Sequence, residues 1–408
     1  MPAPGAGSVS QPQLSERLNT PISAAELERR WGLVRAAMED AGLDALVMQQ
    51  NSEALGGYVR WFTDLPAFDY PVTVVFPRDG RMTVVMHGPL GERELPPEGD
   101  GMFRGVERVI GTASFASVHY TRHYDAELAA PAVEPFARGR VGMLCSYQFG
   151  HAAATYLRDR FPHAGWDDVT ELVDPIKAIK SEEEVARIRD AAALQDEVMR
   201  IAFDAVEPGK KESDVTAVAR RAAHERGSEA GIFLCGAGPI GQPAIIAPRH
   251  MQNRVIREGD VLVLLVEVDG PGGLYAELGR TCTVGPAPAR VKEELAFVLE
   301  AQRFTVGQLQ PGRSCSEIFA AYNEFMREHG RPEERRLHAH GQGYDLVERP
   351  LVRADETMTV EAGMNFAVHP TYFTDGFVAW ICDNWIVGPD GPGDRLHRFP
   401  QEIVELDV

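Results

Sequence analysis

A histidine and a cysteine face each other across a predicted hairpin near the carboxyl end of the sequence. The stretch "AVHPTYFTDGFVAWICDNWIVG" has Asp375-Gly376 between two apolar runs, and a short Asp-Gly in that setting is a strong local signal for two antiparallel strands. If Asp375 and Gly376 form the two-residue turn, His369 lies directly opposite Cys382. An imidazole and a thiol in this arrangement are within reach of a single metal ion.

Acidic residues interrupt a strongly apolar stretch, "GDVLVLLVEVDGPGGLYAELGRTCTVG". The alternation of a strand puts Glu267 and Asp269 on one face of this segment, and Glu277 follows on the next strand, after the Gly-rich turn. Burying a carboxylate is costly unless it is paired or bound to a cation, so these residues suggest a catalytic or metal site. Which of Glu267 and Asp269 enters the site is open, since both also fit the exposed end of a strand.

Two histidines and two aromatic residues are further candidates. The segment "RLHAHGQGYDLVERP" supplies His338 and His340 at strand spacing, next to glycines that permit close approach. Histidines at this spacing are usually surface or core residues, so the pair alone is a weak signal. His338, Tyr344 and Trp380 are candidate substrate-binding residues, although buried aromatic side chains more often belong to a core. Trp380 has the stronger case because it shares a strand face with the hairpin cysteine.

The bulk properties narrow the class of protein. The length of 408 residues suggests two or three domains, and a content of 44% hydrophobic and 25% charged residues is ordinary for a soluble globular protein. A net charge of -19 argues against nucleic acid or an anionic membrane as a partner. The amino terminus lacks the apolar core of a signal peptide, and five irregularly spaced cysteines fit a reducing compartment. We therefore expect a cytoplasmic protein.

Three segments are predicted along the chain. Residues 1–20 have the composition of a disordered tail. Residues 21–175 alternate helical and strand patterns, with a Ser-capped helix over 23–43 and a hairpin over 71–88, which indicates an α/β domain. Residues 176–408 form the second domain, and this domain begins with a long amphipathic helix.

The second domain contains an internal repeat. "PGKKESDVTAVARRAAHERG" (208–227) matches "PGRSCSEIFAAYNEFMREHG" (311–330) at a constant offset of 103 residues. Each copy follows one helix, forms a second and precedes strands, so the domain is predicted to consist of two related helix-helix-strand units. A sheet shared between such units creates a central cleft.

Several ordered motifs in residues 175–400 resemble a known family. They are "IKSEEEVARIRDA", the Arg280-Thr281 pair, "AHGQGYDLVERP", "GMNFAVHP" and "WICDNWIVG". Together they resemble the pita-bread fold of methionine aminopeptidase, prolidase, aminopeptidase P and creatinase, which is peptidase family M24. "NSEALGGYVRWFTDLP" resembles the creatinase-type amino-terminal domain more weakly. The resemblance implies an α/β (α+β), creatinase-like chain of two domains, whose carboxyl-terminal pita-bread domain has an internal pseudo-twofold repeat. It also implies a homodimer.

The sequence departs from the family's peptidases at their metal ligands. Those enzymes hold two ions with two Asp, one His and two Glu, in that chain order. Carried over, the second Asp falls on Glu277, the His on His340, and the two Glu on His369 and Cys382, while the first Asp falls between Val266 and Glu267. Only His340 is identical. Two histidines that act around the scissile bond are also missing, at Ala244 and Val347, so a two-metal peptidase mechanism is in doubt.

The replacement residues still have the chemistry of metal ligands. In the geometry of the family, the second-metal position would be surrounded by Glu277, His340, His369 and Cys382. One carboxylate, two imidazoles and one thiolate suit a single divalent ion, zinc or iron(II). A thiolate at Cys382 in place of a bridging carboxylate would weaken the first-metal position. Glu267 would then be free to act as a base. We expect one such ion or, failing that, no cofactor.

The leading hypothesis is a non-peptidase hydrolase acting on a C–N bond of a small polar substrate, in an amide, ureido or amidino group. A single metal ion would activate the attacking water, and Glu267 or Glu348 would be the general base. Four alternatives remain: a metal-free hydrolase like creatinase, in which His340 moves the proton; a lyase; an Xaa-Pro peptidase-like enzyme; and a binding module. Activity after chelation, an alkene product, or binding without turnover distinguishes among them.

Overall fold

The computed structural model describes residues 18–407 except 53, 54, 67, 68, 98, 245 and 375. The chain divides into two compact units, Met1–Ile176 and Lys177–Val408. The predicted disordered tail lies outside the described residues up to position 17, as does Asp375 of the predicted hairpin turn.

The first unit is built around one sheet of seven strands. Its elements are α2 (Ala24–Ala41), β1 (Ala45–Gln50), α3 (Gly57–Thr63), β2 (Val72–Pro77), β3 (Met82–His87), β4 (Gly91–Glu94), β5 (Val106–Thr112), η1 (His119–Thr121), α4 (Tyr124–Val133), η2 (Glu134–Phe136), β6 (Arg140–Leu144), α5 (His151–Arg160), β7 (Gly165–Asp168) and α6 (Thr170–Ala178). The strand order is β4-β5-β3-β2-β1-β6-β7, with α4 and α5 packed on one face. The predicted helix and hairpin are present: the Ser23 side chain accepts a hydrogen bond from the Glu26 N–H at the start of α2, and β2 pairs antiparallel with β3.

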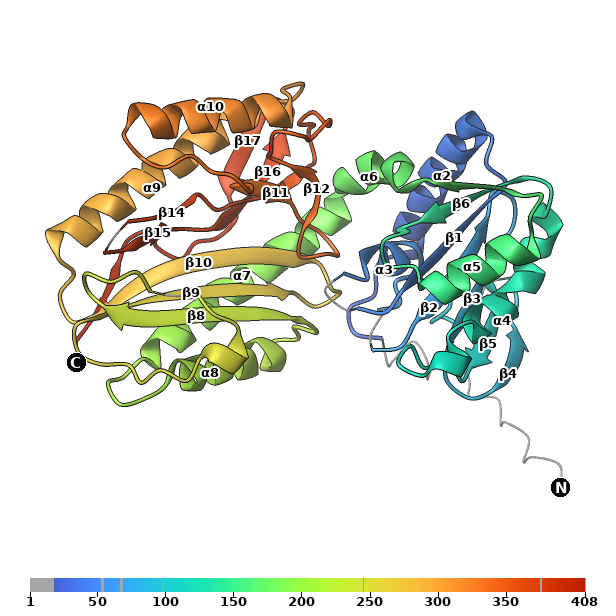
Figure 1. The fold of residues 1–408 in the computed structure, drawn as a ribbon, viewed down its shortest axis with the longest axis horizontal. Coiled ribbons are helices and arrows are strands. Elements are labelled where there is room, and N and C mark those ends of the chain that lie inside the picture. The colour runs from blue at the N-terminus through green and yellow to red at the C-terminus, as the bar shows by residue number, and fades with distance from the viewer. Residues whose placement is uncertain are drawn as a thin grey trace. The chain divides into compact units, whose positions relative to one another are not determined.

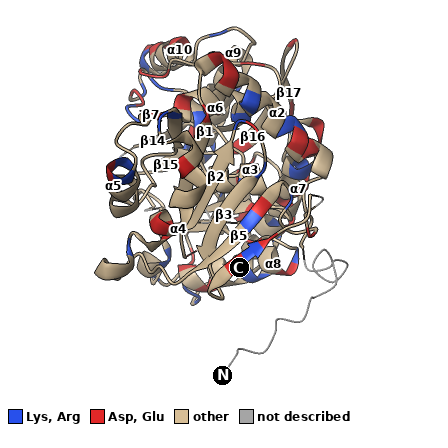
Figure 2. Ribbon diagram, turned by 90° about the vertical axis from the view of Figure 1, so that its right-hand side faces the viewer, with Lys and Arg blue, Asp and Glu red and all other residues tan. Residues whose placement is uncertain are grey.

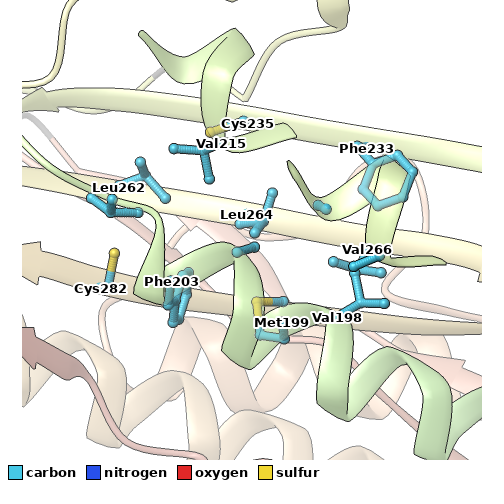
Figure 3. Close-up of a cluster of buried hydrophobic side chains, with 14 of the residues drawn as sticks. Val198, Met199, Phe203, Val215, Phe233, Cys235, Leu262, Leu264, Val266 and Cys282 are labelled. Atoms are coloured by element: carbon cyan, nitrogen blue, oxygen red, sulfur yellow. The ribbon is translucent and has the colours of Figure 1, made fainter. Parts of the chain in front are cut away.

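The first half of the second unit packs two helices on a four-stranded sheet (Figure 1). Its elements are α7 (Glu182–Asp204), α8 (Glu212–Glu225), β8 (Gly231–Pro239), η3 (Arg249–Met251), β9 (Asp260–Asp269) and β10 (Tyr275–Val284), and β18 (Val404–Leu406) joins the sheet from the end of the chain. The order is β18-β10-β9-β8. Figure 3 shows the core between helices and sheet, where Phe203 of α7 and Val215 of α8 pack with Leu264 of β9.

The second half repeats this plan with shorter strands. Its elements are α9 (Ala289–Gln308), α10 (Cys315–Glu328), β11 (Ala339–Gly341), β12 (Glu348–Leu351), β13 (Asn365–Val368), β14 (Thr371–Phe373), β15 (Val378–Trp380), β16 (Asp383–Gly388) and β17 (Gly391–Arg395). β12, β11, β13, β16 and β17 form a five-stranded sheet in that order, while β14 and β15 pair separately.

The predicted repeat is confirmed down to its hydrogen bonds. α8 begins at Glu212 and α10 at Cys315, which keeps the offset of the sequence match. The glycine before each helix donates its N–H to an equivalent carbonyl: Gly209 to Ile256 (2.9 Å) and Gly312 to Val360 (2.8 Å). The two halves therefore share a backbone plan as well as a sequence motif.

The register predicted for the carboxyl-terminal hairpin is confirmed on both sides of the His369–Cys382 pair. Val368 pairs with Asp383, and Thr371 pairs with Trp380. One register thus runs through both pieces and puts His369 opposite Cys382.

The hairpin is broken at this pair, which the sequence did not predict. Cys382 leaves the hairpin and forms an antiparallel bridge to Gly279 of β10, with N–H to O distances of 3.1 and 3.3 Å. Gly279 is required here because a Cβ would lie 2.5 Å from the Trp380 ring and 3.0 Å from the Cys382 Cβ. The missing side chain allows the sheets of the two halves to meet.

Arg280 fixes this junction from inside the core. Its side chain is buried, and its Nη2 pairs with Asp383 Oδ1 at 2.6 Å. The same guanidinium donates from Nη1 to the carbonyl of Cys382 (2.9 Å) and from Nε to the carbonyl of Pro400 (2.7 Å). Arg280 therefore ties β10 to the hairpin and to the carboxyl-terminal segment.

The outer surface carries charges of both signs. Figure 2 shows ribbon segments of both charge colours, and the exposed residues of α7 include Glu182, Arg189, Asp190 and Glu197. Among the helices in the described ranges, none is long and apolar enough to cross a membrane.

Replacing Arg280 is expected to destabilise the second unit strongly. Arg280→Met leaves the Asp383 carboxylate buried with a charge partner removed, which costs about 3–5 kcal/mol. The matched control is Arg353→Met, since Arg353 pairs with Asp355 at the surface and exposed pairs of this kind contribute little to stability. Urea unfolding followed by circular dichroism measures both. If Arg280→Met lowered the free energy of unfolding by less than about 1 kcal/mol, Arg280 would not be what holds β10 to the hairpin.

Candidate functional site

Three side chains from both halves of the second unit converge. Glu277 comes from β10, His340 from β11, and His369 directly follows β13. One potential ligand atom from each lies within 4.8 Å of the other two, and all three residues are buried. His340 Nε2 lies 3.3 Å from Glu277 Oε2, and the two imidazole rings are 5.0 Å apart between centroids. The halves of the repeat thus meet at a group of metal-ligand type.

The chemistry and orientation of this group fit a divalent ion. His340 Nδ1 lies 2.9 Å from the carbonyl oxygen of Gly341, which can only accept a hydrogen bond, and Nε2 lies on the side of Glu277. A backbone carbonyl on the far nitrogen is how proteins orient metal-binding histidines. One carboxylate and two imidazoles form a three-ligand set that leaves a position open for water or substrate.

Electrostatics favour the protonation states that bind a cation. Burial by itself raises the pKa of Glu277, but the nearby His369 and His340 and the Cys382 thiol outweigh it and hold the pKa at about 2. Burial lowers the pKa of His369 to about 4. At neutral pH this leaves a carboxylate facing a neutral imidazole, and both are the forms that coordinate a metal.

Cys382 lies beside this group and contacts it through Glu277. Its buried thiol hydrogen-bonds to the Glu277 carboxylate, and burial together with that negative charge raises the thiol pKa well above its ordinary value. Within the described part of the chain, the mutually close ligand atoms are those of Glu277, His340 and His369, without Cys382. A ligand role for Cys382 requires the thiol to give up its proton and stays a prediction.

Glu267, and not Asp269, lines the same cavity. Glu267 pairs with Glu277 in the register of β9 and β10. Burial, and then the charge of Glu277, raise the pKa of Glu267, while Gln342 Nε2 donates to its Oε1 at 3.1 Å. Asp269 points elsewhere, since its Oδ1 accepts hydrogen bonds from Ser228 and two backbone N–H groups.

A buried amide network, which the sequence analysis missed, supports both glutamates. Asn384 donates from Nδ2 to Gln342 Oε1 (3.0 Å), and its Oδ1 accepts from the N–H of Glu277 (2.7 Å). Gln342 in turn donates to Glu267. The sequence offered one signal for these two residues, namely their spacing from candidate ligands. Gln342 lies two residues after His340, and Asn384 lies two residues after Cys382.

The converging residues line a cavity of about 700 Å³. Apolar side chains such as Leu234 and Leu265 form one wall, which also contains the predicted substrate-binding Trp380. Arg336 also lines the cavity, and its charge acts on both Glu267 and His369. The cavity lining therefore combines ionisable side chains, apolar side chains and an arginine.

His338 and Tyr344 lie away from this cavity. The His338 ring stacks on Tyr322 with centroids 3.7 Å apart, and in the described ranges neither of its nitrogens has a hydrogen-bond partner. Tyr344 is buried and does not line the cavity. The predicted substrate-binding roles of both residues have no support from these positions.

Glu348 lies in a separate buried ion cluster. Lys177 contacts Glu348 and pairs with Asp345 at 3.0 Å, and Lys180 Nζ lies 2.8 Å from Glu348 Oε2. Although burial alone would raise the pKa of Glu348, the two lysines lower it to about 2. A carboxylate held this way accepts a proton poorly, which weighs against Glu348 as general base.

Comparison with known sequences gives a family. Residues 186–389 match the model of metallopeptidase family M24. The chain is 28% identical over 244 residues to the probable dipeptidase PepE of Mycobacterium bovis, covering 59% of this chain and 64% of that protein. It is 24% identical over 250 residues to the Xaa-Pro dipeptidase of Pyrococcus furiosus, covering 58% and 68% respectively. The chain thus spans less than two thirds of the length of PepE.

Comparison with solved structures gives the fold. The dipeptidase PepE from Mycobacterium ulcerans superposes with a TM-score of 0.74 at 23% identity, covering 95% of this chain and 100% of that one. The predicted creatinase-like, two-domain fold class is confirmed.

The Glu348 cluster makes the stability of the protein depend on pH. The pKa of Glu348 is about 2 in the folded state against an ordinary value of 4.5, so its contribution is present above pH 4.5 and is lost as the pH falls toward 2. The loss amounts to roughly 3 kcal/mol. The difference in unfolding free energy between the wild type and Glu348→Gln should therefore shrink from pH 5.5 to pH 3.5 in urea titrations.

Exposed Glu324 on α10 provides the control for this experiment. Glu324→Gln should run parallel to the wild type over the same pH range. A difference for Glu348→Gln that is independent of pH would contradict the ion-paired state of Glu348.

Proposed function

Since the chain belongs to metallopeptidase family M24, we propose that it is a hydrolase that cleaves a C–N bond of a small polar substrate with the help of one divalent ion. The observation that carries this proposal is the convergence of Glu277, His340 and His369 within 4.8 Å. The metal could be zinc or iron(II), since both accept a carboxylate and two imidazoles.

The residues around the cavity would have separate roles in such a reaction. When bound, the ion supplies the Lewis acidity that makes water a nucleophile near neutral pH. Glu267 takes the proton of the attacking water and returns it to the departing nitrogen, and its raised pKa suits that exchange. Gln342 holds the Glu267 carboxylate toward the cavity. Trp380 and the apolar wall hold the body of the substrate.

Two positions support a substrate other than a peptide. Ala244 and Val347 stand where the resembling peptidases carry histidines around the scissile bond. Val347 lines the cavity, and Ala244 is buried in the apolar cluster behind its wall. Neither side chain can donate a hydrogen bond or move a proton.

An Xaa-Pro dipeptidase is the second candidate, because two of the relatives carry dipeptidase names. The metal-free hydrolase, the lyase and the binding module stay predictions, as do the homodimer and the cytoplasmic location.

Metal content tests the ligand set directly. Protein purified without an affinity tag is expected to hold about one zinc or iron per chain by elemental mass spectrometry, and His340→Ala or His369→Ala should remove it. His338→Phe is the matched control, since His338 lies two residues before His340 in the sequence but stacks on Tyr322, and this variant should keep the ion. Two ions per chain, or none in the wild type, would contradict the single-metal site.

Glu267→Gln tests the assignment of the base. This change should lower kcat about 10²–10⁴-fold while the metal content is retained, because Glu267 is outside the three-residue ligand group. Turnover would be assayed with a panel of small amides, ureido compounds and one Xaa-Pro dipeptide, with release of the amine as the readout. Turnover of the dipeptide alone would favour the second candidate, and full activity of Glu267→Gln would exclude Glu267 as the base.

A further inference from the structure

A second cavity, of about 540 Å³, lies on the other face of the sheet that carries the candidate site. We call it the α8 cavity, because α8, η3 and the adjoining ends of β8 and β9 form its walls. Successive side chains of a strand point to opposite faces. On β8, Phe233 lines the α8 cavity whereas Ile232 and Leu234 line the candidate site, and on β9 Val268 and Glu267 divide in the same way. α8 and β8 lie side by side in Figure 1.

The α8 cavity gathers positive charge. Its lining contains four basic side chains, namely Arg220, Arg221 and His224 of α8 and Arg249 of η3, and a single acidic one, Glu229. The chain as a whole has a net charge of -19. The charge of the cavity lining is therefore opposite in sign to the net charge of the whole chain.

One of these arginines already has an anionic partner. Arg221 Nε lies 2.8 Å from Glu225 Oε1, one helical turn further along α8. For Arg220 and Arg249, in contrast, the described part of the chain provides no ion pair. Two of the cationic groups in the lining are thus left without a carboxylate.

Arg220 is also held in place. Its guanidinium lies over the ring of Phe233, 5.0 Å from the centroid. Burial, and then the charge of Arg249, lower the pKa of Arg220. The two guanidinium groups thus repel each other across a preformed space, and an anion between them would offset that repulsion.

We propose that the α8 cavity binds a small molecule carrying a phosphate group or several carboxylates, held between Arg220 and Arg249. Both groups suit the planar, multiple-donor geometry of guanidinium. The cavity volume falls in the range of about 300–1,000 Å³ that is common for small-molecule sites. This site does not depend on the proposed hydrolase activity, because it lies on the opposite face of the sheet.

Isothermal titration of the full chain with inorganic phosphate, and separately with citrate, tests the proposal at constant ionic strength. At least one of the two should bind saturably to the wild type. Arg220→Gln and Arg249→Gln should each weaken that binding about tenfold or more. Arg353→Gln, which removes an exposed arginine elsewhere on the surface, should leave it within about twofold. The anion that binds more tightly identifies the head group.

Arg249→Gln keeps the test valid if Arg220→Gln does not fold, and Arg220→Lys should weaken binding less than Arg220→Gln because it keeps the charge. Phosphate that bound at the candidate metal centre instead would keep its affinity in both glutamine variants. That result, or the absence of saturable binding of either anion to the wild type, would overturn the proposal.

Discussion

The buried contacts of Arg280 are the constraint on which the site depends. Arg280 pairs with Asp383 and binds the carbonyl of Cys382, beside the bridge between Cys382 and Gly279. Glu277 lies three residues before Arg280 on β10, and His369 directly follows β13, which pairs with β16. The contacts of Arg280 therefore fix the distance between the Glu277 carboxylate of the first half and the His369 imidazole of the second. A loose junction would leave the two ligands without a common geometry, since a binding site needs its residues held within about 0.5 Å.

The centre of the second unit also has to hold two neighbouring carboxylates away from water. Like charges at this separation push the two pKa values apart, and here Glu277 stays ionised among histidines while the pKa of Glu267 rises. Gln342 donates to the Glu267 carboxylate and Asn384 accepts from the backbone N–H of Glu277, so both residues are held without added charge. A divalent ion would complete the same arrangement by matching the remaining negative charge. The opposite pKa shifts of the two glutamates, the amide hydrogen bonds and the proposed metal ion would thus all reduce the cost of burying two carboxylates side by side.

Local patterns in the sequence predicted the features that depend on neighbours along the chain. Asp375-Gly376 gave the register that places His369 against Cys382, and the match between the two Pro-Gly helices gave the repeat. The missed features depend on partners far apart in sequence. The bridge from Cys382 to Gly279, the lysines around Glu348 and the link from Gln342 to Asn384 each join segments whose contact no local period encodes. His338 shows the same limit: strand spacing alone could not tell a stacked core histidine from its neighbour His340, which faces the cavity.

We propose that one metal ion binds where the two halves of the repeat meet. Anomalous X-ray diffraction from crystals of untagged protein, collected on either side of the zinc and iron absorption edges, tests it most directly. One anomalous peak per chain is expected, bounded by Glu277, His340 and His369. Two peaks, with the second beside Glu267, or no peak at that position would contradict it.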